Sequence, residues 1–145
     1  MNGFRFQGIE HASLQEKLDQ WIQECQGIII CPSNPYVSVD PFLKLNGVKE
    51  RLAEIPTIAV SPIIGGKALK GPAAKMMKEL GISSSAENIA EHYSALIDGF
   101  VIDEADKESA KSIKIPTIST NTVMLTLSDS ISLAENCLGF LEGFL

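Results

Sequence analysis

The chain has 145 residues, of which 45% are hydrophobic and 21% are charged, a composition typical of globular proteins and too apolar for a disordered chain. Its formal net charge of −6 argues against a protein that coats nucleic acid or an anionic membrane, because such binding needs many Lys and Arg residues. No apolar run is long enough to cross a bilayer and the N-terminus lacks a signal-peptide core, so we expect a soluble, cytoplasmic protein with no nucleic-acid or membrane partner.

The first part of the chain has the pattern of a helix followed by a buried strand. Ser13 and Glu16 have the spacing of a capping box, and Gly27 is expected to close the helix. Four apolar residues recur between them at helical spacing: Leu14, Leu18, Ile22 and Cys25. Residues 27–31, "GIIIC", then form a wholly apolar run, which is typical of a strand covered on both faces.

The middle of the chain repeats this alternation. Residues 47–55 are predicted to be helical and residues 57–61, "TIAVS", to form a second strand. Pro72 stands where a further helix begins and Gly81 where it ends. One apolar stripe lies between them, and we interpret it as core: Ala73, Met76, Met77 and Leu80.

The last third continues in the same way. Ser84 and Glu87 form a second capping box, before a helix with the apolar residues Ile89, Ala90 and Tyr93. Strands are predicted at residues 99–103 and 117–120, with a short polar helix, "DKESAKS", between them. A closing amphipathic helix is marked by Ala134, Cys137, Leu138, Leu141 and Phe144.

Short apolar strands that alternate with helices predict one α/β domain over residues 1–145. We expect a Rossmann-like, three-layer α/β/α fold with a mainly parallel sheet of about four strands. Ligands bind beyond the carboxyl ends of the strands in such folds. The predicted strands end in polar, glycine or proline residues, so the site is expected at that edge.

A glycine-rich segment, "SPIIGGKALKGP" from Ser61 to Pro72, is the strongest candidate for binding phosphate. Gly65 and Gly66 let backbone amides approach an anion, and Lys67 can supply positive charge. The segment is not a Walker loop, because G-x-x-x-x-G-K-[ST] is absent. A plain glycine-rich turn is the alternative.

The corner formed by residues 32–35, "PSNP", is a second candidate. Prolines on both sides restrict the backbone around Ser33 and Asn34, which lowers the entropy lost when a ligand is bound. The alternative is a turn in which these two side chains satisfy their own backbone.

Three carboxylates, those of Asp103, Glu104 and Asp106, follow the third predicted strand. They could hold Mg²⁺, although capping of the next helix explains Asp103 and Glu104 equally well. The three cysteines show no zinc or disulfide spacing and are expected to be reduced and buried. His11 and His92 have no partner at triad spacing, so hydrolase chemistry has no support.

Four long segments together closely resemble the CofD family of 2-phospho-L-lactate transferases: "PSNPYVSVDPFL", "IAVSPIIGGKALKGPAAKMMKELG", "AEHYSALIDGFVIDEAD" and "TNTVMLTLSDSISLAE". The resemblance covers about residues 4–145. It implies an enzyme that transfers a phospholactyl or phosphoenolpyruvyl group from a guanosine diphosphate-linked donor to the deazaflavin Fo in coenzyme F420 biosynthesis, with release of GMP and help from Mg²⁺.

The resemblance also implies which residues bind the donor and its phosphates. These are Ser33, Asn34, Pro35, Ser61, Gly65, Gly66, Lys67 and Gly71. Asp103 and Asp106 are the candidate metal ligands, and no catalytic residue is assigned.

Family members begin with a Gly-rich strand, turn and helix and with an acidic residue that contacts the deazaflavin. This chain resembles their C-terminal half, so it is expected to act with a separate N-terminal half or as a homo-oligomer. Whether it is a fragment or a naturally short relative stays open. The alternative function is a non-catalytic sensor of nucleotides or nucleotide sugars.

Overall fold

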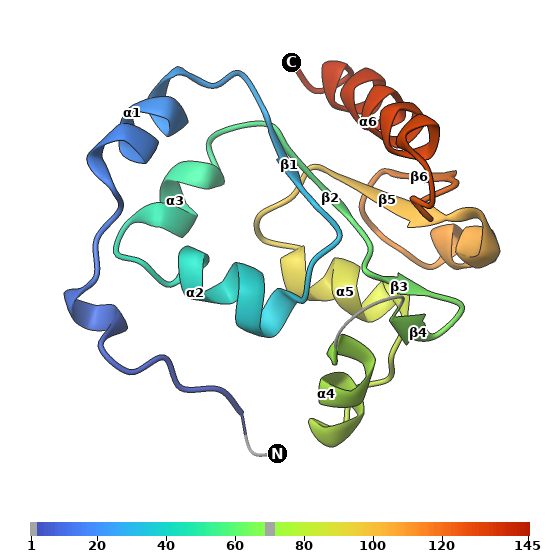
Figure 1. Ribbon diagram of the computed structural model, residues 1–145, viewed down its shortest axis with the longest axis horizontal. Helices are drawn as coiled ribbons and strands as arrows, with labels where there is room; N and C mark the ends of the chain where they lie inside the picture. Colours follow the sequence, from blue (N-terminus) through green and yellow to red (C-terminus); the bar gives the residue numbers. More distant parts are fainter. Residues whose placement is uncertain (1–2, 69–71) are drawn as a thin grey trace.

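The computed structural model describes residues 3–68 and 72–145 (Figure 1). The strands are β1 (Ile28–Ile30), β2 (Thr57–Val60), β3 (Ile63–Ile64), β4 (Lys67–Ala68), β5 (Gly99–Asp103) and β6 (Thr117–Thr120). The α-helices are α1 (Glu16–Glu24), α2 (Asp40–Leu43), α3 (Val48–Leu52), α4 (Ala73–Glu79), α5 (Ala86–Tyr93) and α6 (Leu127–Glu142). The remaining helical segments are the 3₁₀ helices η1 (Ile9–His11) and η3 (Glu104–Lys111) and the π-helix η2 (Pro35–Val39).

Four strands form one fully parallel sheet in the order β1-β2-β5-β6. All four coincide with the apolar or β-branched runs of the sequence, and helical segments connect them along the chain. The predicted α/β fold with a parallel sheet of four strands is therefore confirmed. Because the strands are parallel, their carboxyl ends share one edge of the sheet.

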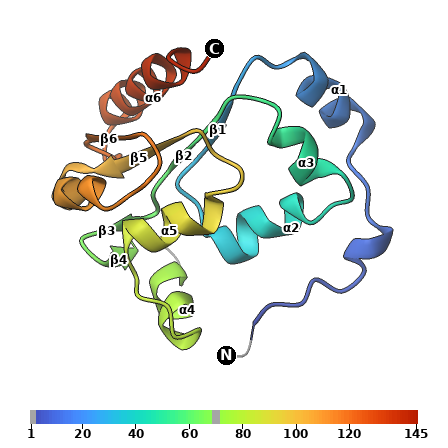
Figure 2. The same cartoon turned by 180° about the vertical axis from the view of Figure 1, so that it is seen from behind.

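The two faces of the sheet are covered unequally (Figures 1 and 2). Helices α1, α3, α4 and α5 all contribute to the larger apolar cluster, with Ala59, Phe100 and Ile102 from the sheet. Helix α6 covers the opposite face, where its buried residues pack on Ile58, Val60 and Val101. Neighbouring strand residues point to opposite faces, which is why the strands are apolar throughout.

Two glycines allow α6 to approach the sheet closely. A Cβ atom at Gly99 would lie 2.6 Å from Phe140 Cε1, and one at Gly27 would lie 2.8 Å from Leu141 Cδ2. Gly27 was expected to close the first helix, but α1 ends at Glu24 and Cys25 caps it. Gly27 instead leaves room for α6 beside β1.

Both capping boxes predicted from serines are wrong. Helix α1 begins at Glu16 and makes no side-chain cap bond, so Ser13 lies outside it. In α5 the cap is Ser85, whose Oγ accepts from the amide of Asn88 at 3.3 Å, and the buried Ser84 hydroxyl has no hydrogen-bond partner among the described residues. The capping box that does form joins Thr126 and Asp129 at the start of α6.

Helix α6 packs on the sheet with a stripe that overlaps the predicted one, since Cys137 and Leu141 are buried and Phe144 packs beside them. Its buried residues are Leu133, Cys137 and Leu141, whereas Leu138 is 54% exposed and Ala134 is also exposed. The expectation of buried cysteines holds only for Cys137, because Cys25 is half-buried and Cys31 is exposed.

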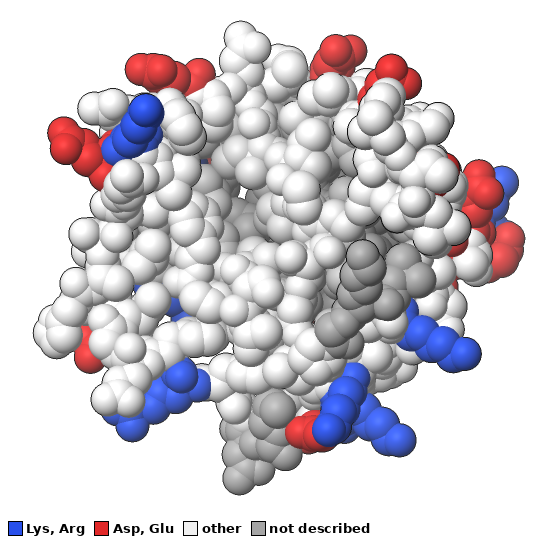
Figure 3. Space-filling view, viewed as in Figure 1, with Lys and Arg blue, Asp and Glu red and all other residues white. Residues whose placement is uncertain are grey.

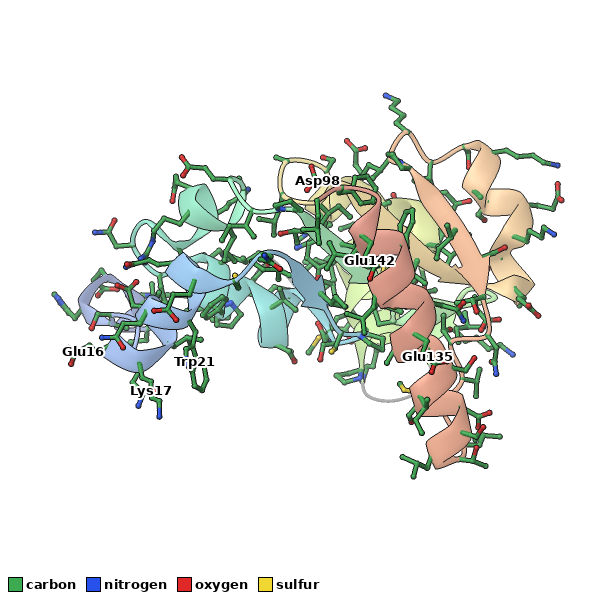
Figure 4. All side chains as sticks on the ribbon, turned by 90° about the horizontal axis from the view of Figure 1, so that it is seen from above. Glu16, Lys17, Trp21, Asp98, Glu135 and Glu142 are labelled. Carbon is green, nitrogen blue, oxygen red and sulfur yellow. The ribbon has the colours of Figure 1, made fainter. Side chains whose placement is uncertain are left out.

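Figure 4 shows the molecule from above, with α1, Lys17 and Trp21 at one end and α6, with Glu135 and Glu142, well away from them on the other side of the sheet. The Trp21 side chain is exposed, and Lys17 Nζ lies 5.6 Å from the centre of its ring. Within the described residues, no helix combines the length and the apolar character that crossing a membrane requires.

Candidate functional site: a cleft at the carboxyl edge of the sheet

A cavity of about 270 Å³ opens where β1, β2 and β6 end. The loops that follow these strands and the start of α4 supply its walls, as the rule for parallel sheets predicts. Eleven of the described residues line this cleft: Pro32, Ser33, Asn34, Ser61, Pro62, Ile64, Ala73, Thr122, Val123, Met124 and Leu125.

The Ser33–Asn34 corner forms the wall that follows β1. Asn34 Oδ1 accepts from the amide of Tyr36 at 3.0 Å, which caps η2, and its Nδ2 lies 3.2 Å from Met76 Sδ. Pro35 is buried at the first position of η2 and does not line the cleft. The Asn34 amide is thus held by the protein, while the Ser33 side chain is exposed at the wall.

Ser61 closes the end of β2 with a tight local turn. Its hydroxyl donates to Ile63 O at 2.9 Å and accepts from the Ile63 amide at 3.1 Å. The residue is buried, so its contribution to the cleft is to fix the path of the chain from Pro62 to Ile64.

Thr122 forms the wall that follows β6, and Asp103 holds it in place. Asp103 Oδ2 accepts from the amide and the hydroxyl of Thr122, both at 2.9 Å, and Oδ1 accepts from the Ala105 amide at 3.0 Å. Burial by itself would raise the pKa of Asp103, but these hydrogen bonds outweigh it and hold the pKa below its ordinary value. Asp103 is therefore charged at neutral pH and braces the loop.

The described part of the glycine-rich segment forms a β-hairpin beside the cleft. Strands β3 and β4 pair in antiparallel fashion, and Gly65 and Gly66 make the turn with φ values of 53° and 75°. Both oxygens of Asp106 accept from the Gly65 amide, at 3.1 and 2.9 Å. The Asp106 carboxylate therefore accepts the hydrogen bond that the Gly65 amide was expected to donate to a phosphate.

Lys67 borders the cleft without lining it. It is exposed and pairs across the hairpin with Ile64, which is a wall residue. All eleven residues of the wall are uncharged. Figure 3 shows basic side chains at the lower edge of the molecule, around α4, where Lys75 and Lys78 are exposed.

Asp103 and Asp106 do not form a preorganised Mg²⁺ site. Every carboxylate oxygen of the two residues already accepts a hydrogen bond from the protein. Within the described residues, no group of three or more His, Cys, Asp or Glu side chains is arranged to hold a metal. Asp103 instead caps η3, which was the alternative reading of its position.

Three of the residues predicted to bind the donor line the cleft: Ser33, Asn34 and Ser61. Gly65, Gly66 and Lys67 lie in the adjoining hairpin, and Gly71 lies outside the described residues. Thr122 and the three apolar residues after it were not predicted as site residues. A signal was available only for Thr122, because the polar end of the last strand, residues 120–122, was expected at this edge.

Comparison with known proteins identifies relatives over nearly the whole chain. The family model for 2-phospho-L-lactate transferase CofD matches residues 3–130. A 2-phospho-L-lactate transferase of Methanocaldococcus jannaschii is 45% identical over 125 residues, which is 86% of this chain and 40% of that protein.

A less similar relative carries the same name and also matches most of this chain. Another 2-phospho-L-lactate transferase, from Methanosarcina barkeri, is 34% identical over 143 residues, or 97% of this chain and 46% of that protein. The chain thus spans less than half the length of these two curated relatives. On the family match and these identities, the chain belongs to the CofD family of 2-phospho-L-lactate transferases.

Proposed function

We propose that this chain supplies the donor cleft of a CofD-type transferase. The reaction moves a phospholactyl or phosphoenolpyruvyl group from a guanosine diphosphate-linked donor to the deazaflavin Fo. The observation that carries the proposal is the position of the cleft: in a member of this family, Ser33, Asn34 and Ser61 meet at the carboxyl edge of the sheet.

The chemistry of the wall suggests how a donor would lie. The apolar side chains of Val123, Met124 and Leu125 suit the uncharged nucleoside, and the Ser33 hydroxyl offers a hydrogen bond. The charged diphosphate would extend to the rim, toward Lys67. Phosphoryl transfer depends mainly on positioning and on stabilisation of charge, which a cation at the rim supplies.

Mg²⁺ belongs to the proposal as a counterion of the diphosphate. Asp103 and Asp106 accept hydrogen bonds from Thr122, Ala105 and Gly65, so these carboxylates are not the proposed ligands of the metal. The cytoplasm is the proposed compartment, where nucleotide donors are made available.

The deazaflavin acceptor would be bound with the help of further protein. The chain spans 40% of its M. jannaschii relative, and the described residues that line the cleft are all uncharged. We propose that an N-terminal half or a second copy of the chain completes the site.

Calorimetry with GDP and Mg²⁺ tests the donor cleft. We expect saturable binding at millimolar ligand or below, and Ser33→Phe should weaken it at least about tenfold by filling the wall. Ser38→Phe is the matched control, because Ser38 is exposed on η2 and does not line the cleft. No binding by the unaltered chain, or equal loss in both variants, would contradict the proposal.

A non-catalytic sensor of nucleotides or nucleotide sugars is the second candidate. The observation in its favour is that none of the eleven wall residues is ionisable, so the described cleft offers binding without an acid or base. A turnover assay with donor and Fo, with and without an added N-terminal half, separates the two. Product formation in either assay eliminates the sensor.

A further inference from the structure

Strand β1 lies at one end of the sheet, where it pairs with β2 alone (Figure 1). The Ile28 amide donates to Pro56 O at 2.9 Å. In a parallel ladder Ile28 and Ile30 therefore bond to β2, and the amide and carbonyl of Ile29 between them point away from it. No described residue outside the sheet bonds to these two groups. The strand thus has an open edge, where a further strand can pair.

The composition of β1 is unusual for an open edge. All three residues are isoleucine, and such a run is typical of a strand that lies inside a parallel sheet. They are only half-buried, whereas every residue of β2 and β5 is buried. The other open edge, at β6, carries Thr117, Ser119 and Thr120, and Asn136 Nδ2 donates to Thr120 Oγ1 at 3.1 Å. The β6 edge therefore suits water, and the β1 edge suits a protein partner.

Helix α6 carries an exposed apolar stripe besides the one that packs on the sheet. Its residues recur at helical spacing: Leu127, Ile131, Ala134 and Leu138. Two contacts show which side of the helix this is, because Leu141 lies over Gly27, just before β1, and Phe140 lies over Gly99 of β5. Ala134 and Leu138 precede Leu141 by two turns and one turn, so the stripe lies on the β1 side of α6. The stripe and the open edge therefore border the same side of the molecule.

We propose that the β1 edge and the α6 stripe form one interface, which binds a strand and its following helix from the N-terminal half of a CofD-type transferase. The strand pairs with β1 through Ile29, in parallel like every other pair of this sheet, and the helix packs on the stripe. The chain spans 40% and 46% of its M. jannaschii and M. barkeri relatives, so more than half of each lies outside the match. The inference rests on the proposed function, in which further protein completes the site.

The same interface would extend the cleft. Strand β1 leads directly into the Ser33–Asn34 corner, and parallel strands end at the same edge of the sheet. The loop after the added strand would therefore lie beside Ser33, whose side chain is exposed. The described wall of the cleft is uncharged, so this loop is where the partner can supply charged groups to the donor.

Co-purification tests the interface without donor or deazaflavin. The tagged N-terminal half of the M. jannaschii relative is co-expressed with this chain, and we expect it to retain the unaltered chain in equal amount. Ile29→Pro should abolish this binding, because it removes the amide that points outward and keeps the bonds of Ile28 and Ile30 to β2. Ser119→Pro is the matched control, since its amide points away from β5 at the opposite edge.

Leu138→Glu gives a second test, which leaves the backbone of β1 unaltered and decides the matter if Ile29→Pro does not fold. It should also abolish co-purification, because it places a charge in the apolar stripe. Ser132→Glu, exposed on α6 outside the stripe, should retain the partner. In hydrogen exchange, the complex should protect the Ile29 amide and leave the Ser119 amide unprotected.

The proposal is overturned if the N-terminal half does not co-purify with the unaltered chain, or if the control variants lose it equally. It is also overturned if the unaltered chain binds only further copies of itself while the N-terminal half is present, because the edge then serves a second copy. Calorimetry of the chain alone with GDP reports on the cleft without this interface. Failure of the donor site and failure of the interface are therefore distinguishable.

Discussion

Asp103 shows how one side chain can shape the cleft without lining it. Its carboxylate joins the end of β5 to Thr122 after β6 and caps η3 at the same time. The sequence offered two readings of this residue, metal ligand or cap, and the hydrogen bonds satisfy both oxygens as a cap and a loop brace. The cleft wall thus depends on the charged carboxylate of Asp103, which holds Thr122 without lining the cleft itself.

Replacing Asp103 with Asn should destabilise the chain by about 1–3 kcal/mol, because hydrogen bonds to a buried charged acceptor are lost or weakened. Glu104→Gln, at the exposed neighbouring position, is the control and should change stability by less than about 0.5 kcal/mol. Urea unfolding at neutral pH measures both. Equal stability of Asp103→Asn and the unaltered chain would show that the brace contributes nothing.

The lowered pKa of Asp103 also predicts a pH dependence. A carboxyl group whose pKa is lower in the folded than in the unfolded state stabilises the fold above the unfolded value of about 3.9. That contribution is lost as the pH falls through the folded pKa. The difference in unfolding free energy between the unaltered chain and Asp103→Asn should therefore shrink in acid; a difference that grows in acid would contradict this assignment.

At the scale of elements, the four-stranded sheet could be predicted from the sequence, whereas the short strands β3 and β4 could not. Runs such as "GIIIC" and "GFVID" are apolar because both faces of each strand are buried, and that burial is visible in sequence. The β3–β4 hairpin has two residues in each strand, too few for any periodicity. The sequence therefore left open whether Gly65 and Gly66 bind phosphate or make a plain turn, and the structure shows that they make the turn of the hairpin.

The prediction for α6 was right for Cys137 and Leu141 but missed Leu133 and included the exposed Leu138, for a related physical reason. Apolar residues occur on two sides of this helix, at Leu133, Cys137 and Leu141 and again at Leu127, Ile131 and Leu138. Sequence alone does not say which stripe meets the sheet. The glycines at positions 27 and 99, which let the helix approach, provide that information only once the strands are aligned.

Gly99→Ala should destabilise the chain by about 1–3 kcal/mol, because the new methyl group would lie 2.6 Å from Phe140 Cε1 and 2.9 Å from Ile58 Cγ2. Gly139→Ala is the matched control, since Gly139 lies inside α6 with nothing within 4 Å of an added Cβ. Alanine favours helix, so this control should be stabilised by about 0.5–1 kcal/mol. Thermal or urea unfolding of both variants compares them, and a neutral Gly99→Ala would argue against close packing of α6.

At the scale of the whole molecule, an apolar surface remains uncovered over α6 and the loop before it. Its residues are Met124, Leu125, Leu127, Ile131 and Leu138. Met124 and Leu125 also belong to the cleft wall, so this surface adjoins the proposed donor site. Surfaces of this kind are typically covered by another protein surface.

Light scattering at micromolar concentration should give a mass above the 15.7 kDa of one chain. Ile131→Glu should reduce that mass by placing a charge in the apolar surface, and Trp21→Glu, on the exposed side of α1 well away from α6, should not. A monomeric mass for the unaltered chain would leave a separate N-terminal half as the proposed partner.

The most direct test of the donor cleft is amide NMR of the labelled chain titrated with GDP and Mg²⁺. We expect the largest shifts at the carboxyl edge of the sheet, at Ser33, Asn34, Ser61 and Thr122, with smaller ones at Lys67. Shifts confined to other surfaces, or none at millimolar GDP, would contradict a donor site in this cleft.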